Sequence, residues 1–341
     1  MLALSKNLAN CYDKKPYLIA RSTTDDTELY FVDEQSLPAQ GCDGAPLDLL
    51  DKREIHSIRS KWKVGKRTFS KIRRALKEQK EEFDLTSDEE NEENVRCCIE
   101  DIENGVLNKL KREVRVSSKW LPYYDLGNST KQVLHSSFIG PSSSGKSFLC
   151  SEILEANFNR NATDIYILSP TANTDEAYLS LRKKLGAKHV KLIDSGEIKR
   201  PIDIEEIARG SVLVVDDVEA CGAVAKKFIC NLQTRCLTDG RHRAKKLKNG
   251  KMQAMTVFSV FHDAFSISTP SIKSSCIESC RVFLFPNLSR SISRKYMKHR
   301  LHFTAKEIKK VFDFVRPSDR WMCIYTHVPQ LLLCKSSCLL L

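Results

Sequence analysis

Between residues 126 and 330, short apolar runs alternate with longer stretches in which apolar residues recur at helical spacing. The short runs end at polar or turn-forming residues, as strands do, and the longer stretches fit amphipathic helices. The predicted strands span residues 133–139, 163–168, 189–193, 211–215, 255–261, 281–285 and 321–325. Repeated β–α units with continuous apolar strands predict an α/β fold, in which helices flank both faces of a mainly parallel central sheet.

Predicted helices separate these strands. The helix that begins near Phe148 carries Leu149, Ile153 and Leu154 on the same side as Phe148. The other helices are predicted over residues 175–185, 202–208, 224–238, 271–279 and two segments within 288–315.

Residues 1–115 differ from the rest of the chain and are expected to form a mostly helical N-terminal extension. Two short strands are predicted within residues 16–32, and residues 49–83 are basic and helical in pattern. An acidic linker, residues 84–96, is expected to be flexible, and a further helix is predicted over residues 95–114.

The basic stretch of this extension has two interpretations that the sequence leaves open. Lysines and arginines concentrate there, Trp62 and Phe69 lie among them, and Gly65 interrupts the helical pattern. Such a segment suits an arm that contacts DNA phosphates. It also suits a solvated helical face whose basic residues pair with acids of its own.

The chain has 341 residues, which suits one large domain and a smaller one. We expect the large domain to span residues 126–330 and residues 331–341 to form a C-terminal tail. Lys plus Arg total 55 against 43 Asp plus Glu, so the formal net charge is +12. This excess favours a polyanionic partner, nucleic acid first, although solubility alone would also account for it.

Cysteine spacing argues against a zinc-binding protein, and the apolar runs argue against a secreted or membrane-spanning one. The 13 cysteines show no complete zinc-type spacing. The polar N-terminus lacks the apolar core of a signal peptide, and the longest apolar runs, such as Leu331–Leu333, are too short to cross a bilayer. We expect a soluble, intracellular, thiol-reduced protein without a membrane partner.

The clearest chemical motif is Gly-Pro-Ser-Ser-Ser-Gly-Lys-Ser, a complete G-x-x-x-x-G-K-[ST] phosphate-binding loop between a predicted strand and a predicted helix. Its glycines let successive N–H groups face an anion, and the helix N-terminus favours negative charge there. Lys146 would reach the β- and γ-phosphates of ATP, and Ser147 would hold Mg²⁺. The predicted ATP-binding residues are Gly140, Pro141, Ser142, Ser143, Ser144, Gly145, Lys146 and Ser147.

Two acids follow directly on the most hydrophobic predicted strand, residues 211–215. Because parallel strands end at one edge of a sheet, Asp216 and Asp217 are expected beside the phosphate loop as a Walker B pair. Asp216 would hold Mg²⁺, mostly through water, and Asp217 would polarise the water that attacks the γ-phosphate. Without the phosphate loop upstream, the same two acids would suit an ordinary surface turn.

His262 ends the predicted strand 255–261, where it would face the γ-phosphate and sense phosphate or orient water, with Asp263 able to fix its ring. A lone histidine also suits a structural role. Two predicted strands, 163–168 and 189–193, lie between the phosphate loop and the acids, which leaves room for a strand inserted between the two motif strands. P-loop ATPases with a catalytic acid have such a strand, and nucleotide kinases more often lack it.

Beyond these single motifs, the chain resembles the viral genome-packaging ATPases of the FtsK/HerA P-loop superfamily, in particular the poxvirus-type and polinton-type enzymes. The matching segments are GPSSSGKS at 140–147, IYILSPTANTDEAY at 165–178, SVLVVDD at 211–217, LTDGRH at 237–242, TVFSVFH at 256–262 and RWMCIYTHVP at 320–329. The resemblance implies a P-loop NTPase of the ASCE type, with ATP and Mg²⁺ as cofactors and Lys146, Asp217 and His262 in catalysis.

The resemblance also implies a biological role. It implies ATP-driven translocation of double-stranded DNA that packages a viral genome into a preformed capsid, at the virus assembly site in the host nucleus or cytoplasm and also in the virion. It implies a homo-oligomeric ring that meets a capsid or portal-vertex protein. One subunit's arginine would reach the next subunit's nucleotide. The candidates are Arg281, Arg290, Arg294 and Arg241. Arg281 or Arg290 is the preferred trans contact, and Arg241 is better suited to a structural or sensing role.

Other functions stay open from the residues alone. A P-loop kinase would need an arginine-rich lid, for which only the basic stretch 290–300 is a candidate. A non-packaging, DNA-dependent ATPase or helicase-like motor would share the same motifs. The basic loop 241–251 suits contact with DNA in a central channel and, from its charge alone, suits a plain solvated loop equally well. A non-catalytic scaffold would have no chemical need for both motif pairs, Lys146 with Ser147 and Asp216 with Asp217.

Overall fold

The computed structural model describes residues 2–5, 17–24, 27–31, 52–78, 92–109, 113–115, 119–123, 135–158, 164–246, 252–265, 269–326 and 330–341. The chain divides into two compact units, the first ending at Trp120 and the second beginning at Leu121. Within the described ranges, no helix is long and apolar enough to cross a membrane.

The first unit contains a small antiparallel sheet and a group of helices. Its elements are β1 (Leu2–Ser5), β2 (Tyr17–Ser22), β3 (Glu28–Phe31), α1 (Lys52–Lys61), α2 (Lys66–Glu78), α3 (Glu92–Lys109) and β4 (Glu113–Arg115), with β5 (Trp120–Pro122) at the boundary. β3 pairs with β1 and with β2, which confirms the two strands predicted within residues 16–32. The extension is therefore not purely helical. The predicted acidic linker, residues 84–96, lies outside the described residues up to residue 91. Its last five residues, 92–96, are not a flexible linker, because they form the start of α3.

The helices of the first unit share a small core. α1 ends before Gly65 and α2 begins after it, as the sequence predicts. Lys61 Nζ and Trp62 Nε1 both donate to Asp101 Oδ2, at 2.6 and 2.7 Å, and these bonds hold the pKa of Asp101 below its usual value. At this point, the basic stretch pairs with an acid of its own unit. The buried core residues are Val64, Ile72, Val95, Cys98 and Ile102.

The second unit is built on one large sheet. Its strands are β6 (Ser136–Ile139), β7 (Ile165–Ser169), β8 (Val190–Asp194), β9 (Val212–Asp216), β12 (Thr256–Phe261), β13 (Arg281–Leu284), β14 (Met322–Tyr325), β15 (Leu331–Cys334) and β16 (Ser337–Leu340). They lie in the order β16-β15-β14-β13-β6-β12-β9-β7-β8. Neighbours from β13 to β8 are parallel, while β14 is antiparallel to β13 and to β15. The predicted α/β fold with a mainly parallel sheet is confirmed.

The C-terminal residues 331–341 are not a tail. β15 and β16 are neighbouring strands of the sheet beyond β14, and the chain reverses between them at Lys335 and Ser336. Leu331–Cys334 is fully buried, because its side chains pack beside β14 on the core of the sheet. The sequence prediction failed here because an apolar run of four residues has too little length to distinguish a strand from an unstructured end.

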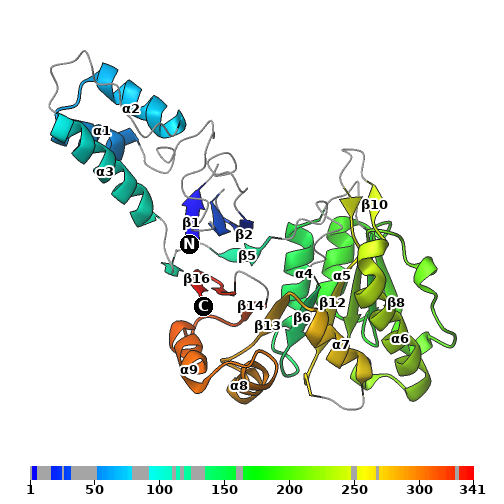
Figure 1. The fold of residues 1–341 in the computed structure, drawn as a ribbon. Helices are drawn as coiled ribbons and strands as arrows, with labels where there is room; N and C mark the ends of the chain where they lie inside the picture. Colours follow the sequence, from blue (N-terminus) through cyan, green and yellow to red (C-terminus); the bar gives the residue numbers. More distant parts are fainter. Residues whose placement is uncertain are drawn as a thin grey trace. The chain divides into compact units, whose positions relative to one another are not determined.

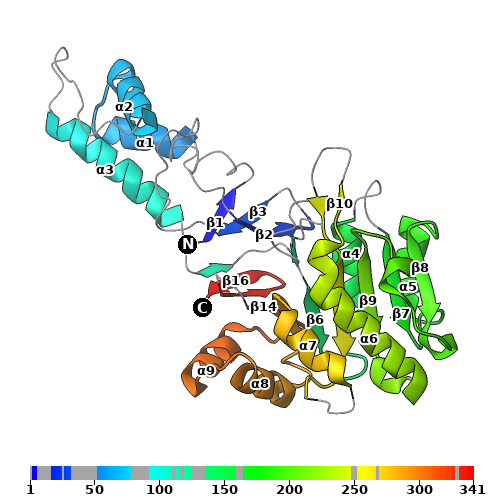
Figure 2. The same cartoon turned by 45° about the vertical axis from the view of Figure 1, so that its right-hand side comes forward.

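Helices cover both faces of the sheet (Figures 1 and 2). α4 (Lys146–Ala156) and α5 (Glu176–Leu185) lie on one face, and α6 (Ala223–Asp239) and α7 (Pro270–Glu278) lie on the other. α8 (Arg290–His299) and α9 (Ala305–Phe314) pack beside the antiparallel end of the sheet. The short elements are η3 (Ser195–Glu197), η4 (Ile204–Glu206), η5 (Val218–Ala220), η6 (Gly240–His242), β10 (Lys245–Lys246) and β11 (Met252–Gln253). The helix predicted over residues 202–208 is only the 3₁₀ turn η4.

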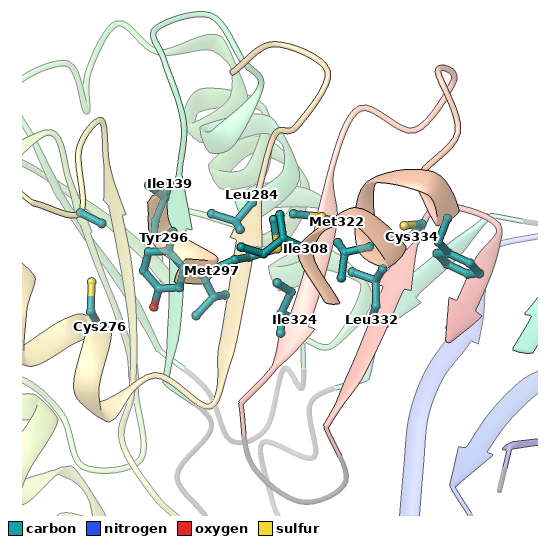
Figure 3. Packing of buried hydrophobic residues seen from close by; sticks show 14 of the residues in the cluster. Ile139, Cys276, Leu284, Tyr296, Met297, Ile308, Met322, Ile324, Leu332 and Cys334 are labelled. Atoms are coloured by element: carbon teal, nitrogen blue, oxygen red, sulfur yellow. The ribbon is translucent and has the colours of Figure 1, made fainter. Parts of the chain in front are cut away.

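The core beneath α8 and α9 holds the phosphate loop's strand in place (Figure 3). Ile139, the last residue of β6, packs in the same cluster as Leu284 of β13 and Tyr296 of α8. All three side chains are at most 1% exposed. Burial of such side chains stabilises a fold by about 1.5–3 kcal/mol each. The cluster therefore fixes the point where β6 ends and the phosphate loop begins.

Candidate nucleotide-binding site

The phosphate loop joins β6 to α4 in a conformation that depends on its glycines. Gly145 has a φ of 93°, in the left-handed region that favours glycine, and Ser143 has a φ of 60°. A Cβ on Gly140 would lie only 2.8 Å from Phe285 Cδ2. The N–H of Gly140 donates to the carbonyl of Phe261 at 3.3 Å, which ties the start of the loop to the end of β12.

Two polar side chains of the loop are buried in a way that fits a bound phosphate. Lys146 is 7% exposed, and its Nζ donates to the carbonyl oxygens of Gly140 and Pro141, each at 2.9 Å. Burial lowers the pKa of Lys146, while the nearby carboxylates raise it. Ser144 Oγ is buried, and no described residue gives it a hydrogen-bond partner. Phosphate oxygens would satisfy both groups, so these residues fit ATP.

Asp216 ends β9 against the first turn of α4. Ser147 Oγ donates to Asp216 Oδ2 at 3.4 Å, and the hydroxyl of Tyr178 donates to the same oxygen at 2.7 Å. Burial raises the pKa of Asp216 to about 6, although the hydrogen bond from Tyr178 and the charge of Lys146 lower it. Hydroxyl and carboxylate oxygens are the ligands that Mg²⁺ prefers. The residues here fit the metal role predicted for Ser147 and Asp216.

Asp217 is the N-cap residue that precedes η5, and it has the left-handed conformation, with a φ of 52°. Its Oδ1 lies 3.3 Å from His262 Nε2, and His262 Nδ1 lies 3.4 Å from Lys146 Nζ. Because a lysine ammonium can only donate, this geometry places the ring proton of His262 on Nε2, facing Asp217. His262 therefore bridges the loop lysine and the second acid. Asp263 does not fix this ring, because its carboxylate accepts the N–H of Phe265 at 2.9 Å.

β12 is the strand that separates the two motif strands. It pairs in parallel with β6 on one side and with β9 on the other, so His262 lies between the phosphate loop and the acids. The strands between the two motifs in sequence, β7 and β8, lie beyond β9 instead. An inserted strand therefore exists, as expected, but it comes after the acids in the chain. α6 crosses one face of the sheet and returns the chain from β9 to β12.

A pocket of about 320 Å³ opens beside the loop and the histidine. α8 supplies one of its walls, next to Arg290. Arg290 is exposed at the start of α8, and its guanidinium carbon lies 4.4 Å from the ring centre of Phe312. Arg294 follows one turn later and is also exposed. The residues that line the pocket are Pro141, His262, Asp263, Ser291, Ile292 and Lys295.

Two of the predicted arginines lie at the other end of the strands. Arg281 begins β13 opposite Ser136 of β6, whereas the phosphate loop follows the other end of β6. It is 1% exposed and lies 4.9 Å from the ring centre of Tyr325, so it does not suit contact with a neighbouring subunit. Arg241 lies in η6, whose first residue, Gly240, accepts a hydrogen bond from the residue before β12. The side chain of Arg241 lies outside the described residues.

The basic loop 241–251 is described only at its base. β10 and β11 pair as an antiparallel hairpin, and Lys245 and Lys246 on β10 are exposed. Residues 247–251 lie outside the described part of the chain. Gly210, just before β9, lies beside Lys245, which places this hairpin at the edge of the sheet opposite the phosphate loop.

Two neighbours of the site were not predicted from the sequence. Tyr178 contacts Asp216, and Glu219 Oε2 accepts the backbone N–H of His262 at 3.3 Å. Glu219 lies two residues after the acid pair, so the acidic run itself was the available signal. Phe148 also differs from the prediction. It is 59% exposed, whereas Leu149 behind it is 2% exposed, because the buried face of α4 begins one residue later.

The strand order and the loop together define the architecture. The fold is that of a P-loop NTPase. Neither protein-family models nor curated proteins give a match to the sequence.

Several solved structures are similar to the chain. The genome packaging NTPase B204 from Sulfolobus turreted icosahedral virus 2, solved with sulfate, has a TM-score of 0.36 at 12% identity, over 60% of this chain and 96% of that one. The cytoplasmic domain of the Thermomonospora curvata Type VII secretion ATPase EccC has a TM-score of 0.36 at 11% identity, over 74% of this chain and 32% of that one. EssC from Geobacillus thermodenitrificans has a TM-score of 0.31 at 12% identity, over 67% of this chain and 42% of that one. At these scores the similarities carry no functional argument, which rests on the residues of the site.

Proposed function

We propose that this protein hydrolyses ATP with Mg²⁺ and uses the energy to move double-stranded DNA. The observation that carries the proposal is the row from Lys146 through His262 to Asp217, with separations of 3.4 and 3.3 Å. This row brings a lysine, a histidine and a carboxylate together at one edge of the sheet, which supports roles for them in binding phosphate, sensing it and activating water. Such a set suits the transfer of a γ-phosphoryl group to water.

Each residue has a distinct part in this proposal. Lys146 would exchange its bonds to the loop carbonyls for bonds to the β- and γ-phosphates. Asp217 would accept a proton from the attacking water, and His262 would hold that carboxylate in place through its Nε2 proton. Ser147 and Asp216 would hold the metal, which when bound neutralises charge on the phosphates.

The motor part of the proposal rests on other features. The ordered motif set resembles that of viral genome-packaging ATPases, the excess of positive charge suits DNA, and the base of the basic hairpin is exposed. We propose a homo-oligomeric ring that packages viral DNA into a capsid, with a capsid or portal-vertex protein as a further partner. In this ring Arg290 and Arg294 are favoured over Arg281 as the trans arginine, because both are exposed whereas Arg281 is buried.

The test measures DNA movement by the full-length protein. A third strand bound to linear duplex DNA is displaced when a translocase runs into it, so its release reports movement. We expect ATP-dependent displacement, together with a particle mass of several subunits. Phosphate transfer to an added nucleoside monophosphate, without displacement, would favour a kinase instead. ATP binding with no phosphate release, even with DNA and capsid protein, would favour a scaffold.

A further inference from the structure

Tyr178 is a buried tyrosine to which the sequence motifs assign no role. It lies in the first turn of α5, and its side chain is 0% exposed. A hydroxyl that is buried away from water is costly unless it makes a hydrogen bond. The hydroxyl of Tyr178 makes that bond to Asp216 Oδ2, at 2.7 Å. The tyrosine therefore contacts the acid that we assign to the metal from α5, whereas Ser147 contacts it from α4.

The two hydroxyl groups near Asp216 reach the same carboxylate oxygen. Ser147 Oγ lies 3.4 Å from Oδ2, which is a longer contact than the 2.7 Å bond from Tyr178. Hydrogen bonds to a charged acceptor are shorter and stronger than neutral ones. The tyrosine bond is therefore the interaction that fixes the plane of the carboxylate. Ser147 can leave Oδ2 for a metal while Tyr178 still holds it.

α5 presents Tyr178 from a fixed position. The side chain of Asp175 caps the helix by accepting the N–H of Ala177 at 2.8 Å. The N–H of Asp175 in turn donates to the carbonyl of Thr171 at 2.8 Å, in the turn that follows β7. β7 is parallel to β9, which ends at Asp216. The helix that carries the tyrosine thus follows β7, the strand next to the one that ends at the acid.

We propose that Tyr178 is a positioning residue that holds Asp216 in the orientation needed to bind the metal of the metal–ATP complex. This inference rests on the proposed function, because it assigns a partner to the metal ligand of that site. Groups that orient metal ligands typically change metal affinity by 10–100-fold when they are removed. Tyr178 does this without touching the metal or the nucleotide.

The test is metal binding rather than turnover. Mn²⁺ reports its own binding by electron paramagnetic resonance, so it is titrated into full-length protein saturated with a non-hydrolysable ATP analogue. We expect Tyr178→Phe to weaken Mn²⁺ binding to this complex by about 10–100-fold. Binding of the analogue in EDTA should not change. Tyr166→Phe is the matched control, because the Tyr166 hydroxyl accepts from Lys191 Nζ at 2.9 Å and lies on a neighbouring strand.

Further measurements test whether Tyr178 acts through Asp216 and separate this inference from the proposed function. If Tyr178 acts through Asp216, the losses from Tyr178→Phe and Asp216→Asn will be less than additive. Equal Mn²⁺ affinity in wild type and Tyr178→Phe would overturn the inference while leaving the proposed function intact. Absence of analogue binding in the wild type would overturn both. If the Phe variant does not fold, Tyr178→Met fills a similar volume without a donor and is judged by the same titration.

Discussion

The two edges of the large sheet each carry a histidine, and the two histidines are held differently. At the edge away from the loop, His135 Nδ1 accepts the N–H of Val257 at 3.0 Å, and its Nε2 bonds the carbonyl of Leu237 at 3.1 Å. At the loop edge, His262 has side-chain contacts of 3.4 Å to Lys146 and 3.3 Å to Asp217. The first ring joins backbone groups, and the second joins two charged side chains.

This difference separates a structural histidine from a functional one within a single sheet. His135 is 3% exposed, and both of its ring nitrogens are used by the backbone, so it has no capacity left for a ligand. His262 is partly exposed and lines the pocket beside the loop. Its contacts are long enough to rearrange when phosphate enters. Residue type alone therefore says little, and the partners decide the role.

At the loop edge of the sheet, the variant with the largest expected effect is Lys146→Ala. We expect loss of ATP binding, because the ammonium supplies the positive charge at the β- and γ-phosphates. Fluorescent-nucleotide binding measures this directly. Lys184→Ala removes a lysine that pairs with Glu155 at 2.8 Å on the surface, and it should bind ATP normally. ATP binding by Lys146→Ala at wild-type affinity would mean that the loop does not hold the phosphates.

Asp217→Asn tests whether Asp217 is the general base at the same edge of the sheet. We expect ATP binding to persist and turnover to fall by about 10²–10⁴-fold, the usual range for loss of a general base. Phosphate release in single-turnover mode measures the chemical step. Glu219→Gln is the informative partner variant, because that carboxylate bonds the backbone of His262 rather than its ring. A larger fall for Glu219→Gln than for Asp217→Asn would move the base role to Glu219.

At the edge of the sheet away from the loop, His135 should make the stability of the protein depend on pH rather than affect nucleotide binding. Burial lowers the pKa of His135 to about 4, although its bond to Leu237 raises it. The unfolded state therefore binds the proton first, so the stability is complete above pH 6.5 and is lost as pH falls toward 4. The loss reaches about 3 kcal/mol by pH 4.

Urea unfolding at a series of pH values measures this loss. His135→Phe cannot bind the proton, so its unfolding free energy should fall less steeply over the same window, from a lower starting value. The raised pKa of Asp216 changes stability with pH in the opposite direction. Because Asp216 is present in both the wild type and His135→Phe, the difference between their unfolding free energies is the quantity to compare. Parallel pH profiles for the two proteins would contradict the structural assignment of His135.

The smallest effect is expected from substitutions in the basic hairpin, at the edge of the sheet away from the loop. If Lys245 and Lys246 contact phosphates, changing both to Ala reduces the slope of log K against log salt by about 2 for duplex DNA. Fluorescence anisotropy at several salt concentrations measures this slope. ATP binding without DNA should stay at the wild-type level. An unchanged slope would leave the first unit's basic helices as the alternative DNA contact.

Sequence predicts the parts of this site that a local motif encodes. The loop residues and the two acids follow from spacing, because a phosphate loop needs its glycines, lysine and serine in one short segment. Tyr178 was missed because its partner, Asp216, lies 38 positions away and meets it only in the folded sheet. Helical spacing placed Phe148 on the buried side, although the face of α4 that meets the sheet begins at the next residue.

Strand order was the other limit of prediction. The pattern of apolar runs predicted the strands of the second unit's large sheet from β6 to β14, but pairing depends on tertiary contacts that a single sequence does not display. β12 follows β9 in the chain and still inserts between β9 and β6. β15 and β16 extend the sheet from a run that sequence alone assigned to a tail. Both outcomes reflect burial against neighbours rather than local propensity.

One measurement tests the central claim most directly. Phosphate release by the full-length wild-type protein is followed with Mg²⁺ and ATP, with and without linear double-stranded DNA. We expect DNA to stimulate steady release, and we expect Asp217→Asn to bind ATP but to release phosphate about 10²–10⁴-fold more slowly under either condition. Full release by Asp217→Asn, or release by the wild type that DNA does not change, would contradict a DNA-coupled ATPase site at the loop edge of this sheet.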